Sequence, residues 1–108
     1  MSEHFLTPED SATFQMARYA KADLARGEHL FVGLNCFEPG QGQPVHTHAA
    51  ADKFYLVLSG NARMIVGDET RDAAAGTLVW APQGIPHGVE SASERTVMLV
   101  GIAPHPPG

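Results

Sequence analysis

Two stretches of this sequence decide its fold: Gly40–His48, which reads GQGQPVHTH, and Gly76–His87, which reads GTLVWAPQGIPH. The first ends in two histidines separated by one residue. If this segment is extended, alternate side chains point to the same side, so the imidazoles of His46 and His48 can reach one ion. Neutral imidazole is a ligand for Zn, Fe, Ni, Cu or Mn. A pair of this kind also occurs on protein surfaces, so the pair alone leaves both interpretations open.

The wider spacing of glycines, proline and histidines follows a longer pattern: Gly40-(x)5-His46-x-His48, then Gly60, then Gly76-(x)5-Pro82-x-Gly84-(x)2-His87. This pattern resembles the two signatures of the cupin superfamily, G-(x)5-H-x-H-(x)3,4-E-(x)6-G and G-(x)5-P-x-G-(x)2-H-(x)3-N. The resemblance implies an all-β fold with a single-domain cupin β-barrel, a double-stranded β-helix or RmlC-like jelly roll. It also implies that His87 faces His46 and His48 across the barrel and that the three bind one divalent metal per chain.

The sequence departs from the family pattern at two positions. Lys53 stands where the family has its metal-binding Glu, and Ser91 stands at the closing Asn. A lysine ammonium has no lone pair and repels a metal ion. The neighbouring Asp52 carries a carboxylate, but alternation along a strand points it away from Lys53. The resemblance therefore implies three histidines without a carboxylate ligand, and a pocket that favours an anion.

Two interpretations of Lys53 stay open. A lysine on a strand is more commonly solvated and paired with a nearby acid, and that is the ordinary expectation here. The family register instead places Lys53 in the pocket, together with Tyr55 on the same face of the strand. Tyr55 is expected in the core, where its hydroxyl can also serve the pocket.

Short β-favouring runs bounded by glycine and proline are typical of an all-β sandwich or barrel. Thr7-Pro8-Glu9-Asp10 predicts at most a short N-terminal helix, and residues 17–26 have helical propensity but no continuous apolar stripe. We predict a polar N-terminal segment (1–12), a barrel (13–104) and a tail (105–108). The expected strands are residues 14–18, 29–37, 54–58, 63–66, 69–71, 77–80 and 96–102.

Composition excludes several partners. The 108 residues carry a formal net charge of −5 and no run of Lys or Arg, so neither nucleic acid nor an anionic membrane is an expected partner. A single cysteine, Cys36, forms no internal disulfide, and the first residues lack the pattern of a signal peptide. We therefore expect a cytoplasmic protein. Phe54, Leu56, Leu58 and Trp80 are expected in the core or on an apolar outer face that pairs two chains as a homodimer.

Three function classes follow. The leading hypothesis is a metal-dependent enzyme, of a dioxygenase-like oxidoreductase or isomerase-like type, that acts on a small anionic organic substrate. In it the metal is a Lewis acid or, if iron, an O2-activating centre. The alternatives are a non-catalytic module that binds or senses a small ligand, and a structural remnant without metal. Three imidazoles do not select among Fe, Mn, Zn, Ni and Cu.

Overall fold

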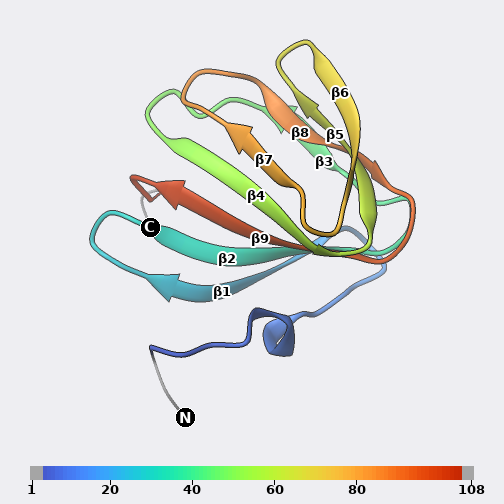
Figure 1. Ribbon diagram of the computed structural model, residues 1–108, viewed down its shortest axis with the longest axis horizontal. Helices are drawn as coiled ribbons and strands as arrows, with labels where there is room; N and C mark the ends of the chain where they lie inside the picture. Colours follow the sequence, from blue (N-terminus) through green and yellow to red (C-terminus); the bar gives the residue numbers. More distant parts are fainter. Residues whose placement is uncertain (1–3, 106–108) are drawn as a thin grey trace.

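A computed structural model describes residues 4–105 of the chain (Figure 1). Residues 1–3 and 106–108, the outer ends of the predicted N-terminal segment and tail, lie outside the described residues. Strand order is β1-β2-β9-β4-β7 in one sheet and β3-β8-β5-β6 in the other. The elements are η1 Pro8–Ser11, β1 Ala20–Arg26, β2 Phe31–Phe37, β3 Gln43–His46, β4 Asp52–Ser59, β5 Asn61–Val66, β6 Glu69–Ala74, β7 Leu78–Ala81, β8 His87–Ala92 and β9 Thr96–Ala103.

The two sheets face each other as layers (Figure 1), and the core lies between them. Alternation along β4 illustrates the arrangement, because Lys53, Tyr55 and Val57 are buried while their neighbours are not. Tyr55 and Val57 pack in one cluster with Met64 of β5 and Met98 of β9. The predicted all-β architecture is therefore confirmed, with helical structure in residues 4–105 limited to the single 3-10 turn η1.

The predicted strand positions agree with the structure for the six expected runs after residue 28, which correspond to β2, β4, β5, β6, β7 and β9. Three strands were not predicted: β1, β3 and β8. The β1 strand falls in the segment with helical propensity, where pairing with β2 overrides that propensity. The β3 strand ends at His46 and the β8 strand begins at His87, and neither has an apolar alternation that would have indicated it.

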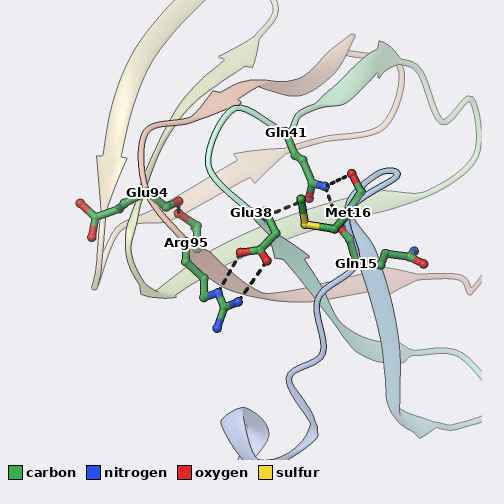
Figure 2. A network of polar contacts seen from close by, with 7 residues as sticks. Gln15, Met16, Glu38, Gln41, Glu94 and Arg95 are labelled. Carbon is green, nitrogen blue, oxygen red and sulfur yellow. Dashed lines mark hydrogen bonds and ion pairs between the residues drawn. The ribbon is translucent and has the colours of Figure 1, made fainter.

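The strand predicted at residues 14–18 is wrong, because hydrogen bonds to a side chain replace strand pairing there. The amide Nε2 of Gln41 donates to the carbonyl oxygens of Gln15, at 2.8 Å, and Met16, at 3.3 Å. Gln41 is itself held through its Oε1, which accepts from the Glu38 backbone N–H at 2.9 Å. Figure 2 shows the resulting network, in which Gln41 connects residues 15 and 16 to Glu38, the residue that follows β2.

A second contact holds Phe14 in place. Arg95 donates from Nε and Nη2 to the two carboxylate oxygens of Glu38, at 2.9 and 3.0 Å (Figure 2). Its guanidinium lies 4.1 Å from the centroid of the Phe14 ring, within the range of a cation–π interaction. The Phe14 ring therefore packs against Arg95, and residue 14 is not part of a strand.

The outer side of β7 carries exposed apolar side chains, whereas Phe54, Leu56 and Leu58 of the neighbouring β4 are half-buried. Trp80 is 54% exposed and Leu78 is 60% exposed, and both line a surface concavity of about 330 Å³. None of the three motif histidines lines that concavity. A homodimer through this face stays a prediction. In residues 4–105, no helix combines the length and hydropathy needed to cross a membrane.

Two signature glycines occupy tight turns that need a positive φ, and only one of them is also closely packed. Gly60 has φ of 89° and Gly76 has φ of 92°, in the left-handed region that favours glycine. A Cβ at Gly60 would collide with Arg95 O and Thr96 Oγ1 and lie 2.7 Å from Thr96 Cα, whereas a Cβ at Gly76 would meet open space. The turn at Gly60 thus requires glycine for its conformation and for its close approach to the start of β9.

We expect Gly60→Ala to destabilise the chain more than Gly76→Ala. Both variants carry the left-handed penalty of about 1–2 kcal/mol, and Gly60→Ala adds about 1–3 kcal/mol for overpacking against Thr96. Urea denaturation measures the free energy of unfolding of each variant. Equal losses in the two variants would contradict the close packing of this turn.

Candidate metal centre

Strand pairing brings His46 and His87 together. His46 is the last residue of β3, His87 is the first residue of β8, and the two are directly opposite in the antiparallel ladder. His48 lies two residues beyond the end of β3, so the extended strand includes only His46 of this pair. The loop that carries His48 is fixed through its carbonyl oxygen, which accepts from Gly84 N–H at 2.9 Å. The glycine of the second signature therefore helps to place a histidine of the first.

The three imidazoles form one compact cluster. Ring centroids are 4.4 Å apart for His46 and His87, 4.9 Å for His46 and His48, and 5.4 Å for His48 and His87. One ring nitrogen from each histidine lies within 4.8 Å of the other two. Three ring nitrogens this close together can bind one ion once the rings move inward, because imidazole nitrogens bind zinc at about 2.0–2.1 Å.

Hydrogen bonds to the backbone orient two of the rings for metal binding. The Nδ1 of His46 is 2.9 Å from Pro44 O, and the Nδ1 of His87 is 2.8 Å from Ile85 O. Because a carbonyl oxygen only accepts, Nδ1 carries the proton in both rings, and Nε2 of the neutral ring keeps its lone pair. In His87, which is 1% exposed, this Nε2 is buried without a hydrogen-bond partner. A metal ion fits these residues, because it would satisfy that nitrogen.

The surroundings favour neutral imidazole in two of the three histidines. Burial lowers the pKa of His48 below its usual value of 6.5, and the positive charge of Lys53 lowers it further. Burial also lowers the pKa of His87, against an opposing effect of its hydrogen bond to Ile85. Both rings are therefore unprotonated at neutral pH, as metal ligation requires.

Lys53 lies in the interior, and Asp52 does not. Lys53 is 8% exposed, and burial together with the nearby Lys21 lowers its pKa from 10.5 to about 8. Its Nζ lies 4.6 Å from the centroid of the Tyr55 ring. The expectation of a solvated lysine paired with an acid is therefore wrong, because the side chain points into the barrel. Asp52 is exposed and accepts a hydrogen bond from Gln83 N–H at 2.9 Å.

Tyr55 is fully buried beside the cluster. Its ring centroid is 6.2 Å from that of His87, and its hydroxyl donates to Gln43 Oε1 at 2.6 Å. The amide Nε2 of Gln43 donates in turn to the Tyr19 hydroxyl at 3.1 Å. Burial raises the pKa of Tyr55 well above its usual value of 10, so this hydroxyl stays protonated and acts as a donor. This hydrogen bond fixes Gln43, which lines the cavity described next.

A cavity of about 410 Å³ adjoins the cluster and is lined by His46, His48 and Lys53. It is also lined by Lys21 and Asn35, which sequence reasoning missed. Asn35 gives a signal in retrospect, because it is the amide side chain within the otherwise apolar β2 sequence FVGLNCF. Lys21, which is exposed, gave none, because its place at the cavity depends on pairing with Asn35 across β1 and β2.

Comparisons with known proteins agree with this geometry. A sequence model of the family described as Cupin domain matches residues 33–102. The uncharacterized protein SCO3923 of Streptomyces coelicolor is 35% identical over 85 residues, covering 79% of this chain and 80% of that protein.

Two crystal structures have the same fold. TT1209 from Thermus thermophilus has a TM-score of 0.89 at 33% identity, with 94% of this chain and 98% of that chain covered. An RmlC-like cupin from Desulfovibrio desulfuricans has a TM-score of 0.78 at 30% identity, with 88% and 91% covered. Because the family model spans more than half of its residues, the chain belongs to the cupin family, and its barrel is a double-stranded β-helix.

Proposed function

We propose that this cupin is a metal-dependent enzyme in which His46, His48 and His87 hold one divalent metal ion, and that it acts on a small organic anion. The observation that carries the proposal is the orphaned, buried Nε2 of His87, oriented by the bond from Nδ1 to Ile85 O. Three neutral ligands leave coordination positions for substrate, and a metal in such a site supplies Lewis acidity. The metal itself stays unspecified, since imidazole suits several ions.

Charge supports the choice of an anion. Neutral imidazoles leave the charge of a divalent ion uncompensated, and Lys53, in place of a carboxylate, adds positive charge beside them. A substrate anion offsets both charges, and the cavity next to the cluster has room for a small molecule. The role of the chain in this proposal is to orient the imidazoles, to keep those of His48 and His87 neutral and to attract the anion.

Of the two enzyme types, we propose the dioxygenase-like oxidoreductase first. An isomerase needs a base close to its substrate. Within residues 4–105 no carboxylate lines this cavity, so the base of an isomerase would be Lys53, whose pKa burial brings to about 8. The alternative, a module that binds an organic anion without turnover, uses the same residues and differs only in the outcome of the test below.

His87→Ala is expected to abolish tight metal binding. Protein purified without a histidine tag, stripped with chelator and titrated with Zn²⁺, should bind one ion per chain. The variant should lose at least about 100-fold in affinity, because altering even an outer partner of a ligand costs 10–100-fold. His29→Ala, which removes an exposed histidine outside the cluster, is the matched control and should bind as the unaltered chain does.

Absence of stoichiometric metal in the unaltered chain, or equal binding by both variants, would overturn the metal site. Oxygen uptake by the Fe²⁺-loaded protein with diketones or thiols tests the reaction class. Oxygen consumption by the unaltered protein that is lost in His87→Ala supports the oxidoreductase. Ligand-induced thermal stabilisation without consumption supports the binding module instead.

Zn²⁺ affinity should decrease as pH falls, and the decrease should begin at a lower pH in the folded chain than in an unfolded peptide that carries His46 and His48. Burial lowers the pKa of His48 and of His87 below its usual value, so protons compete with the metal for these two rings only at lower pH. A peptide spanning residues 40–48 lacks the surrounding barrel and should begin to lose Zn²⁺ at higher pH. Calorimetric titration at a series of pH values measures the Zn²⁺ affinity of the peptide and of the protein. An equal pH profile for the two would contradict the effect of burial.

A further inference from the structure

Both lysines of the chain line the cavity beside the histidines. Among the seven cationic residues of the sequence, Lys21 and Lys53 are the only lysines. Lys21 comes from β1 and Lys53 from β4, strands separated by β2 and β9 in the same sheet. Lys53 lines this cavity from a buried position and Lys21 from an exposed one, so positive charge gathers at one cavity of a chain whose net charge is −5.

Within residues 4–105, neither lysine is paired with an acid. The ion pairs of these residues all use arginines, namely Arg63, Arg71 and Arg95. Each lysine lies instead over a tyrosine ring, with Nζ 4.6 Å from the Tyr55 centroid for Lys53 and 5.7 Å from the Tyr19 centroid for Lys21. Lys21 is exposed, whereas Lys53 is buried, and a ring face compensates a buried ammonium only in part. The charge of Lys21 also acts on Lys53, so the two cations repel each other across the cavity.

The remaining polar groups of the cavity wall add hydrogen-bond donors. Asn35 is 3% exposed, lines the cavity, and its Nδ2 is buried without an acceptor. The Tyr19 hydroxyl accepts from Gln43, which leaves its proton for another partner. Unpaired buried donors cost free energy, and an acceptor that entered the cavity would recover it. The chemical complement of this wall is therefore an anion that accepts several hydrogen bonds.

We propose that Lys21, Lys53 and Asn35 form a subsite for the carboxylate of a short-chain organic acid. Phe31, Val100 and Ile102 form apolar parts of the same wall and suit a hydrocarbon body, which an inorganic anion lacks. Charge-assisted hydrogen bonds from the two ammonium groups supply most of the attraction. The inference rests on the proposed function in one respect, because it identifies the organic anion as a carboxylate held by residues outside the histidine cluster.

Butyrate and its uncharged isostere butyramide provide a test that needs no variant. Amide chemical shifts in two-dimensional NMR, recorded at pH 7 on the full chain with and without Zn²⁺, report binding of each probe. We expect butyrate to bind at least about tenfold more tightly than butyramide, because only the carboxylate makes charge-assisted hydrogen bonds to the lysines. A tenfold difference in affinity corresponds to ~1.4 kcal/mol. Inorganic phosphate, which has charge but no hydrocarbon, should bind more weakly than butyrate.

Lys53→Met and Lys21→Met should each weaken butyrate binding and leave butyramide binding nearly unchanged. Arg71→Met removes the same charge from an exposed residue of β6 and should bind butyrate as the unaltered chain does. Equal affinity for the acid and the amide, tighter binding of phosphate, or full binding by both lysine variants would overturn the subsite.

The metal-free arm separates this inference from the proposed function. Butyrate binding in the metal-free chain and in His87→Ala supports the subsite even if the chain fails to bind Zn²⁺. Stoichiometric Zn²⁺ binding with no preference for butyrate over butyramide overturns the subsite and leaves the metal centre standing.

Discussion

The hydrogen bonds from Nδ1 of His46 and His87 to backbone carbonyls are the constraint on which the candidate site depends. In both histidines the acceptor is the carbonyl two residues earlier, at Pro44 and Ile85. Each bond fixes the tautomer and the direction of Nε2. Because the two histidines are also opposite each other in the β3–β8 ladder, one local backbone geometry, used twice, sets the position and chemistry of two ligands. The Gly84–His48 bond then adds the third.

Positive charge is the second organising feature of the interior. A lysine, Lys53, occupies the place of the carboxylate expected from the family pattern, and burial with Lys21 nearby brings its pKa to about 8. A metal at the histidines would increase the local positive charge rather than cancel it. The fold therefore carries an electrostatic imbalance that an incoming anion can offset. Lys53 is therefore the residue that supports both the proposed anionic substrate and the proposed carboxylate subsite.

The sequence predicted the scaffold of the site better than its walls. The spacing of His46, His48 and His87 identified three residues that the structure brings together, because motif glycines fix turns through local conformation. Strand alternation correctly separated Lys53 from Asp52, but the ordinary expectation of a solvated lysine was wrong. Burial of Lys53 and Asn35 depends on which strands neighbour β4 and β2, and this is a non-local property. The misplaced strand at residues 14–18 has the same cause, since Gln41 lies far away in sequence.

X-ray absorption spectroscopy of the Zn²⁺-loaded chain tests the central claim most directly. The pre-oriented cluster predicts three imidazole nitrogens at about 2.0–2.1 Å, with the remaining positions filled by oxygen from water or an added carboxylate. The same spectrum should lose one imidazole in His87→Ala. A first shell with fewer than three imidazoles in the unaltered chain, or one unchanged by the substitution, would contradict a metal centre built on these histidines.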